Sequence, residues 1–169
     1  MFNKDFSLAK NLYENAFPEN ERRSLSSLDN LVENSPYFHF LPIHENNSFA
    51  GFATVWNFSQ FIYIEHFAIL PKLRNMGIGS RFLKNLQDKY QKAIVLEVEL
   101  PDNDIAKNRV SFYQRLGFKL LPDFYMQPAY SKEKESIEMK VMLYSKENSQ
   151  TPSFQTIKDI LYKQVYNVE

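Results

Sequence analysis

The stretch that most constrains the fold is a short polar turn with two glycines, Leu73 to Ser80, which lies between an apolar run and an amphipathic segment. The apolar run, Phe61 to Leu70, is typical of a buried strand, and Pro71 ends it because proline has no backbone N–H for strand pairing. After the turn, apolar residues recur at four-residue spacing and predict a helix with one buried stripe, at Ile78, Phe82, Leu86 and Tyr90. The order of strand, glycine turn and helix is typical of a phosphate-binding loop.

The glycines at 77 and 79 favour an anion site for a physical reason. Without side chains, the backbone N–H groups of the turn approach an anion closely, and the helix dipole favours negative charge there. An ordinary left-handed turn before a helix uses glycine equally well, so the pair alone leaves both interpretations open. The turn is not a dinucleotide fingerprint, because Phe82 stands where the third glycine belongs. It is not a Walker motif either, because no Lys-Ser or Lys-Thr follows.

Length, charge and cysteine content limit the classes of protein to consider. The chain has 169 residues, enough for one ordinary domain, and its 20 basic and 20 acidic residues cancel. This balance gives no electrostatic reason to expect nucleic acid or an anionic membrane as a partner. The absence of cysteine excludes disulfides, thiolate metal sites and a cysteine nucleophile. We therefore expect a cytoplasmic protein, monomer or homodimer, without a signal peptide or membrane-spanning segment.

The remaining pattern predicts an α/β fold with one central mixed sheet. Strands are expected at 37–43, 48–57, 61–70, 93–100 and 137–145, and helices at 7–17, 26–34, 78–90 and 106–116. Short connections favour antiparallel neighbours among the first three strands, whereas the helix after the glycine turn predicts a parallel crossover. We expect a single domain over residues 1–169, with a strand stub at 1–6 and a helical extension at 146–169 packed on it.

Two motifs resemble those of the GNAT N-acetyltransferase superfamily. The turn from Arg74 to Gly79 is similar to the acetyl-CoA motif Arg/Gln-x-x-Gly-x-Gly/Ala, and Ser111 to Phe118 looks like the family's Phe/Leu-Tyr-x-x-x-Gly-Phe segment. The pair at this separation is far more specific than either motif alone. The resemblance implies the GNAT acyltransferase fold, a mixed, mostly antiparallel sheet with one splayed parallel pair of strands, flanked by helices.

The resemblance also implies where acetyl-CoA binds as cosubstrate. Its pyrophosphate is expected on the turn and its pantetheine arm along the end of the preceding strand. The residues assigned in this way are Phe67, Ala68, Ile69, Arg74, Asn75, Met76, Gly77, Ile78, Gly79 and Ser80. The family's asparagine seven residues before the tyrosine is replaced by Ala106, but Asn103 and Asn108 are nearby, and Asn108 is the candidate for a side-chain contact. No residues stand at metal-ligand spacing, and we expect no metal.

Tyr113 is the sharpest single-residue hypothesis. By resemblance it stands where many family members place the tyrosine that protonates the departing thiolate, and a phenol is protonated at neutral pH. The alternative is that its ring only packs on the buried face of a helix, beside Val110 and Leu116. A backbone N–H near residues 67–69 is expected to stabilise the oxyanion of the tetrahedral intermediate.

An attacking amine must also lose a proton, so a base is needed near the acyl carbon. Glu65, Glu97 and Glu99 are the candidates. We favour Glu65 and Glu97 because both lie in strongly apolar strands, where a carboxyl pKa tends to be raised. Charged residues near strand ends also commonly face solvent and do nothing more. In a regular strand His66 points to the face opposite Glu65.

These features together predict a catalytic function. We expect an N-acetyltransferase that moves the acetyl group of acetyl-CoA to a primary amine of a small molecule or peptide. The amine attacks directly, because no cysteine is present to form a covalent intermediate. One alternative is a non-catalytic acyl-CoA-binding or regulatory domain of the same fold, and another is a nucleotide-binding fold. The tyrosine and the carboxylates favour the enzyme.

Overall fold

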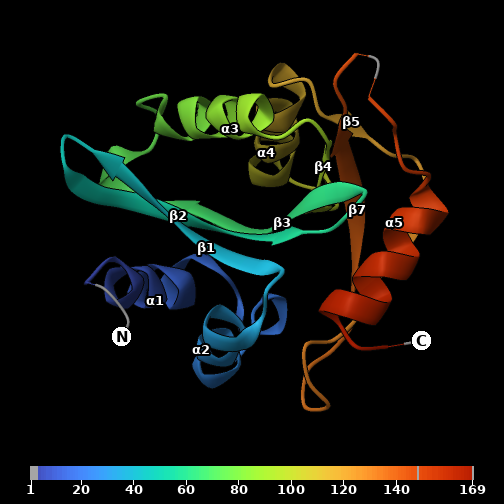
Figure 1. The fold of residues 1–169 in the computed structure, drawn as a ribbon, viewed down its shortest axis with the longest axis horizontal. Coiled ribbons are helices and arrows are strands. Elements are labelled where there is room, and N and C mark those ends of the chain that lie inside the picture. The colour runs from blue at the N-terminus through green and yellow to red at the C-terminus, as the bar shows by residue number, and fades with distance from the viewer. Residues whose placement is uncertain (1–3, 148, 169) are drawn as a thin grey trace.

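A twisted sheet runs through the molecule and separates two groups of helices (Figure 1). The computed structural model describes residues 4–147 and 149–168. The strands are β1 (Phe38–Glu45), β2 (Ser48–Asn57), β3 (Phe61–Ile69), β4 (Ala93–Glu99), β5 (Lys119–Leu120), β6 (Tyr125–Gln127) and β7 (Ile137–Tyr144). The helices are α1 (Lys4–Ala16), α2 (Leu25–Asn34), α3 (Ile78–Lys89), α4 (Asp104–Arg115) and α5 (Phe154–Ile160). Shorter helical turns are η1 (Glu19–Glu21), η2 (Pro71–Leu73) and the π-helical η3 (Leu161–Val165).

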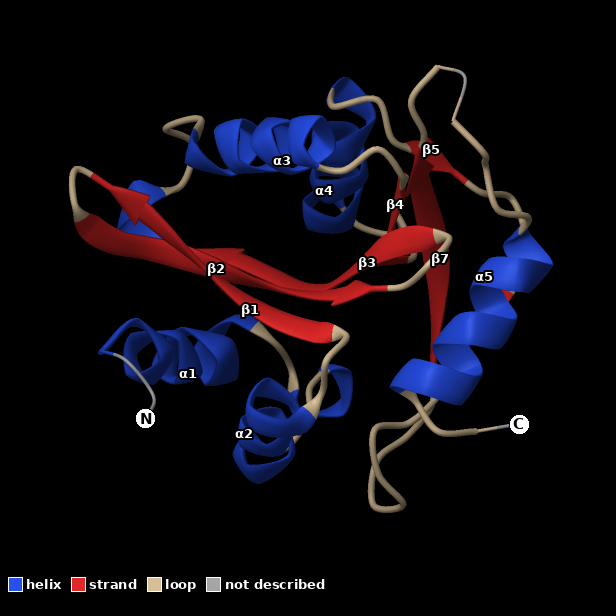
Figure 2. Cartoon of the chain, in the orientation of Figure 1, coloured by secondary structure: helices blue, strands red, loops and turns tan. Residues whose placement is uncertain are grey.

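All neighbouring strands except one pair are antiparallel. The seven-stranded sheet has the order β1-β2-β3-β4-β7-β5, and β6 also pairs with β7. Short turns join β1 to β2 and β2 to β3, whereas α3 crosses over between β3 and β4 and makes that pair parallel (Figure 2). The prediction of a mixed, mostly antiparallel sheet with one parallel pair is confirmed.

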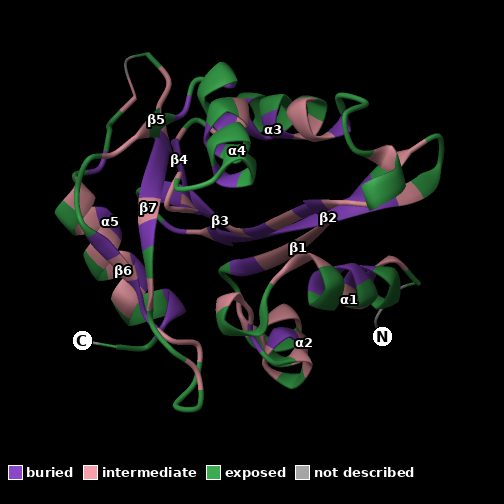
Figure 3. Ribbon diagram, turned by 180° about the vertical axis from the view of Figure 1, so that it is seen from behind, coloured by how far each residue is buried: buried purple, intermediate pink, exposed green. Residues whose placement is uncertain are grey.

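Helices cover both faces of the sheet, and each face has its own apolar cluster. Helices α3 and α4 lie on one face, and α1, α2 and α5 on the other (Figure 3). Leu83 and Val110 belong to the first cluster, whereas Tyr13, Leu28 and Ile157 belong to the second. Because side chains alternate along a strand, the central strands supply both clusters and are buried along most of their length. No helix among the described residues is long and apolar enough to cross a membrane.

The parallel strands β3 and β4 are paired over only part of their length. Their register begins at Phe61 and Ala93 and ends at Ile64 and Leu96. Beyond these residues the two strands separate, and the sheet opens between them. The separation matches the splayed pair that the family resemblance implies.

A bulge in β3 lies at the point of separation. Val55 of β2 pairs with Ile64, and the adjacent Thr54 pairs with His66, so Glu65 is an extra residue on β3. An extra residue shifts the alternation of side chains by one position. As a result Glu65 and His66, which a regular strand would place on opposite faces, both turn toward the α1 and α2 side of the sheet.

The amino-terminal helix begins earlier than predicted. Residues 4–6 start α1, so the strand stub expected at 1–6 is wrong for these residues. Residues 1–3 lie outside the part of the chain that the structure describes. The physical reason is that Phe6 is buried together with Ala9 and Tyr13, which extends the helical stripe by one turn.

Helix ends follow the expected capping chemistry. Ser24, Asn103 and Ser153 each accept a hydrogen bond from a backbone N–H in the first turn of α2, α4 and α5. Gly117 follows α4 with a φ of 86°, a left-handed conformation that glycine adopts without strain. These local signals set where the elements begin and end.

Candidate active site

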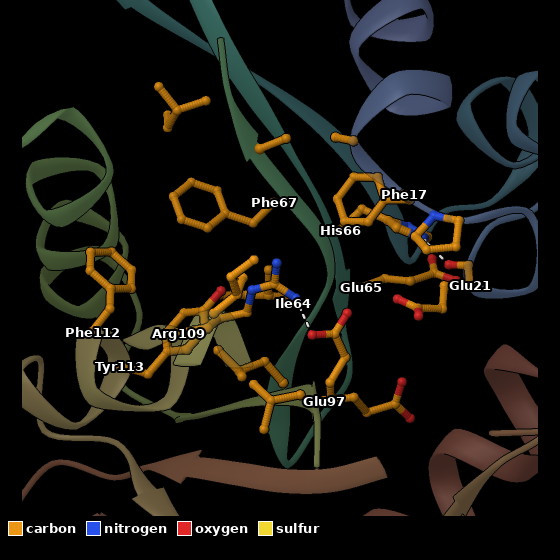
Figure 4. Close-up of a pocket in the computed structure, with 18 of the residues that line it drawn as sticks. Phe17, Glu21, Ile64, Glu65, His66, Phe67, Glu97, Arg109, Phe112 and Tyr113 are labelled. Atoms are coloured by element: carbon orange, nitrogen blue, oxygen red, sulfur yellow. Dashed lines mark hydrogen bonds and ion pairs between the residues drawn. The ribbon is translucent and has the colours of Figure 1, made fainter. Parts of the chain in front are cut away.

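A cavity of about 560 Å³ lies where β3 and β4 separate. Its walls come from the ends of both strands, from α4, from the segment that joins α1 to α2, and from β6 and β7. In Figure 4, Phe67, Phe112 and Tyr113 lie on one side of the cavity, and Phe17 and Glu21 lie on the other. The separation of two parallel strands therefore forms an opening through the sheet that both helical layers reach.

The glycine turn borders this cavity at the amino end of α3. Gly77 has a φ of 75°, and within the described residues no side chain caps the helix that it begins. A Cβ on Gly79 would lie 3.2 Å from Cζ of Phe67, so glycine lets α3 approach β3 closely. The Nε of Arg74 donates to the Ile69 carbonyl at 3.1 Å, which holds a basic side chain beside the turn. Uncapped backbone N–H groups next to a guanidinium suit an anion.

Tyr113 is held on α4 with its ring buried and its hydroxyl open to the cavity. The residue is 8% exposed, lines the cavity, and packs edge-on against Phe112 and Phe118. Within the described part of the chain its hydroxyl has no hydrogen-bond partner, and the hydroxyl oxygen is not sealed inside the protein. Burial raises the pKa of Tyr113 to about 12, although the nearby Arg109 opposes the rise. The phenol is therefore protonated at neutral pH and free to donate to a ligand.

Glu97 on β4 is a half-buried carboxylate surrounded by uncharged donors. Tyr63 donates to its Oε2 at 2.8 Å, Tyr166 at 2.7 Å and Gln127 at 2.6 Å. Tyr125 donates to the other oxygen, Oε1. Burial raises the pKa of Glu97, and the hydrogen bonds to the charged form offset only part of that rise. This carboxyl group consequently exchanges a proton closer to neutral pH than an ordinary glutamate does.

The side chain of Glu65 is buried, but its main partner is a cation. Both Nε and Nη2 of Arg23 lie 2.9 Å from Oε1, and Trp56 Nε1 donates to Oε2 at 2.8 Å. The guanidinium also lies over the ring of Tyr130, 4.8 Å from its centroid. Burial by itself would raise the pKa of Glu65, but the Arg23 charge and the hydrogen bonds outweigh it, and the net shift is downward. Glu65 is therefore ionised at neutral pH, with both oxygens engaged.

His66 lies next to Glu65 on the same side of the sheet, because the bulge has shifted the alternation. Its ring packs edge-on against Tyr13 and Phe17, each with ring centroids 4.7 Å away. Its Nε2 donates to the Glu21 carbonyl at 2.9 Å, since a carbonyl can only accept. Burial lowers the pKa of His66, so the neutral ring serves to attach η1 to β3.

A charged cluster lies at the mouth of the cavity. Arg109 of α4 and Glu99 at the end of β4 form an ion pair with an N–O distance of 3.0 Å. Glu21 of η1 lines the same cavity as these two residues. Burial first and then the Glu99 charge raise the pKa of Glu21, while the Arg109 charge lowers it. Glu99 pairs with this guanidinium, and Glu21 adds a second carboxyl group to the wall of the same cavity, so this region suits a cationic ligand.

The structure brings most of the predicted coenzyme residues to one place. Those that line the cavity are Phe67, Ala68, Ile69, Arg74 and Asn75. Residues 76–80 are not part of the lining, but they form the turn and the start of α3 that border it. Asn108 is exposed on α4 and does not line the cavity, so its contact with a coenzyme stays a prediction.

Sequence reasoning did not predict the hydrogen bonds around the two carboxylates, although residues 125–130 resemble a tyrosine, glutamine and proline stretch of some family members, which implies a place at the wall of the acceptor site. Tyr125 and Gln127 alternate on β6, so the sequence pattern alone shows that they share one face. By contrast, Arg23 lies 42 residues from Glu65 in the chain, and Tyr166 lies 69 residues from Glu97. No local pattern connects residues at these separations.

Comparisons with known proteins agree with this geometry. Residues 6–118 match the model of the acetyltransferase (GNAT) family. A protein from Bacteroides thetaiotaomicron, named as an acetyltransferase of the GNAT family, is 35% identical over 97% of this chain and 93% of its own, with a TM-score of 0.89. The ribosomal-protein-S18-alanine N-acetyltransferase from Escherichia coli is 17% identical over 90% of this chain and 96% of its own, with a TM-score of 0.62. A GNAT family acetyltransferase from Elizabethkingia anophelis with acetyl-CoA bound is 17% identical over 73% and 84%, with a TM-score of 0.52.

Proposed function

This chain belongs to the acetyltransferase (GNAT) family, and we propose that it transfers the acetyl group of acetyl-CoA to a primary amine of a small molecule or peptide. The observation that carries the proposal is the cavity between β3 and β4. It is lined both by Tyr113, whose hydroxyl is open to the cavity and has no partner within the described residues, and by Glu97, a carboxyl group with a raised pKa. A group that keeps its proton and a group that can take one are what acyl transfer to an amine requires.

The donor half of the site is the side that the glycine turn borders. Uncapped N–H groups at the start of α3, together with Arg74, offer charge complementarity to the coenzyme A pyrophosphate. Phe67 and Phe112 offer apolar surface for the pantetheine arm. The family match and the acetyl-CoA bound to the Elizabethkingia relative support acetyl-CoA as the donor.

The acceptor half is the side toward α1 and η1. Glu21, Glu97 and Glu99 make this side negative, and such a field concentrates amines, which arrive as ammonium ions. Glu97 takes the proton of the ammonium, directly or through a water. Because Glu65 is neutralised by Arg23 and its pKa is lowered, we assign it the role of holding the fold around the site.

The reaction then follows from the positions of these groups. The neutral amine nitrogen attacks the thioester carbonyl carbon and forms the new N–C bond. We assign stabilisation of the oxyanion to a backbone N–H near residues 67–69 of β3, where pairing with β4 has ended. When the C–S bond breaks, Tyr113 gives its proton to the sulfur, and coenzyme A leaves as the thiol. No enzyme nucleophile is needed, and the chain contains no cysteine.

The proposal is tested by release of free thiol from acetyl-CoA over a panel of amines that includes diamines, amino sugars, amino acids and short peptides. Thiol release that requires an amine, with the acetylated product seen by mass spectrometry, is the expected result. Calorimetric titration with coenzyme A runs in parallel. Tight binding without turnover on any amine would support the alternative, a non-catalytic acyl-CoA-binding or regulatory domain. Failure to bind coenzyme A would contradict both.

A further inference from the structure

The carboxyl-terminal helical segment contacts Glu97 directly and contacts Glu65 through Arg23. Tyr166, directly after η3, donates to Oε2 of Glu97 at 2.7 Å. The carbonyl of Val165, one residue earlier, accepts from Arg23 Nη2 at 2.7 Å, and Arg23 is the residue that pairs with Glu65. Two consecutive residues at the end of this helical segment therefore contact Glu97 and the ion-pair partner of Glu65.

A π-helical turn ends at these two residues. Ile157 and Leu161 are buried at the four-residue spacing of an α-helix. At η3 the helix widens, and Tyr166 N donates to the Leu161 carbonyl, five residues back, at 3.1 Å. Neighbouring residues of an α-helix point about 100° apart, yet Val165 and Tyr166 are both buried, at 1% and 7% exposure. Val165 and Tyr166 are thus both buried at the end of the widened turn, where one offers its backbone carbonyl and the other its hydroxyl.

From these contacts we propose that Tyr166 is a positioning residue for Glu97: its hydroxyl aims the carboxylate and holds it in the ionised form that takes the proton of the acceptor amine. The inference rests on the proposed function, in which Glu97 is the base. Residue 166 lies outside the span that matches the family model, 6–118, so the family match by itself assigns it no role.

The surroundings of Glu97 show what the Tyr166 hydroxyl contributes. The groups that face this carboxylate are Tyr63 from β3, Tyr125 and Gln127 from β6 and Tyr166, with Tyr130, Tyr162 and the Arg23–Glu65 pair farther away. The four direct donors are all neutral, so each hydrogen bond carries a large share of the stabilisation of the charge. The Tyr166 hydroxyl also lies 3.2 Å from that of Tyr63, so its loss disturbs a second donor.

The test replaces the hydroxyl and keeps the ring. Tyr166→Phe retains the packing on Tyr130, whose ring centroid is 5.2 Å away, and removes the hydroxyl with its hydrogen bond to Glu97 and its contact with the Tyr63 hydroxyl. The acidic limb of the pH profile of kcat/KM is expected to move upward by about one pH unit, the effect of losing one hydrogen bond to a charged group. Tyr162→Phe is the matched control, because this hydroxyl of the same helix donates to the Met126 carbonyl and not to Glu97. Its profile should stay that of the unsubstituted protein.

A second readout does not depend on turnover. The pKa of Glu97 is followed by NMR of protein with ¹³C-labelled glutamate carboxyl groups, with the resonance assigned through Glu97→Gln. An upward shift in Tyr166→Phe but not in Tyr162→Phe supports the positioning role. An unchanged pKa in a folded Tyr166→Phe, or an equal shift in both variants, overturns it. If no amine is acetylated by the unsubstituted protein, the proposed function fails, and the NMR titration still decides whether Tyr166 controls the proton affinity of Glu97.

Discussion

Glu65 on β3 and Glu97 on β4 lie on neighbouring strands of one sheet, and both line one cavity, yet their pKa values shift in opposite directions. Glu65 is held by Arg23 and by the Trp56 indole. Glu97 is held by hydroxyl groups and an amide, without a cation among its direct donors. The pKa of Glu65 falls, whereas that of Glu97 rises.

The difference shows that burial alone does not identify a base. Removal from water raises the pKa of both carboxyl groups, and it is the largest single cause at each. At Glu65 a guanidinium in contact reverses the sign, whereas neutral donors at Glu97 only reduce the rise. A carboxylate paired with a cation serves the fold, and one caged by neutral donors remains able to exchange a proton.

The largest expected effect is on activity, and it distinguishes Glu97 from Glu65. Glu97→Gln should lower kcat/KM roughly 10²- to 10⁴-fold and abolish the acidic limb of the pH profile, because it removes the general base. In the unsubstituted protein, that limb lies above the usual range for glutamate, and the rate rises with pH as Glu97 loses its proton. Glu65→Gln is the counterpart and should keep the acidic limb in the fraction that folds. The assignment of Glu97 as the base is wrong if Glu65→Gln loses the acidic limb and Glu97→Gln retains it.

The second prediction concerns Tyr113, the proposed proton donor on the other side of the cavity from Glu97. Tyr113→Phe keeps the ring packing on Phe112 and Phe118 and should lower turnover by roughly two to four decades, because the thiolate then leaves without a proton. The acidic limb from Glu97 should persist. Coenzyme affinity, measured by calorimetry, is the control and should not change. Unchanged turnover with unchanged affinity would leave Tyr113 as a packing residue only.

The cation at Glu65 is expected to matter for stability. Arg23→Met should destabilise the protein at neutral pH by about 3 to 5 kcal/mol, because an uncompensated carboxylate is left buried. In the unsubstituted protein the lowered pKa of Glu65 means that its contribution is present above the unfolded pKa and is lost as the pH falls through the folded one. In Arg23→Met burial raises that pKa instead, so protonation of Glu65 recovers part of the lost stability on acidification.

Urea unfolding of both proteins at pH 7 and pH 5 measures this effect. The loss of unfolding free energy in Arg23→Met relative to the unsubstituted protein should be smaller at pH 5 than at pH 7. Taking the difference between the two proteins cancels the contribution of Glu97, which is present in both. A loss that is equal at both pH values would mean that Glu65 is not the group left without a partner.

The smallest expected effect concerns the second donor to Glu65. Trp56→Phe removes the indole N–H and should cost about 1.5 to 3 kcal/mol, the usual value of a hydrogen bond to a charged group. The pH profile of activity should not move, since Trp56 donates to Glu65 and not to Glu97. Thermal unfolding measures the loss of stability, and the pH profile of kcat/KM is measured on the same preparation. A displaced acidic limb would show that the two carboxylates titrate as one coupled system.

Most elements of the fold were predictable from local spacing. The strand at Ser48–Asn57 was predicted with both of its ends, and Ser24 and Gly117 mark helix ends where capping chemistry expects them. The bulge at Glu65 was not predicted, because nothing in an apolar strand shows where its partner skips a residue. That single bulge decides that Glu65 and His66 lie on one face.

What the sequence determined by itself is the set of features that depend on near neighbours in the chain. The glycine turn before α3, the placement of Tyr113 on α4 and the apolar stripes all follow from spacings of two to four residues. Through the family resemblance that they carry, these features imply which strands separate and which helices border the cavity. They also present Glu65 and Glu97 as equals, since both are acids in otherwise apolar strands.

Only the tertiary structure decided between them. Proton affinity depends on the charges and donors within a few ångströms in space. At Glu65 the deciding group is Arg23, 42 residues away in the chain, and at Glu97 one donor is Tyr166, 69 residues away. Packing brings a guanidinium to one carboxylate and hydroxyl groups to the other, and that placement separates an ion pair of the fold from the proposed base.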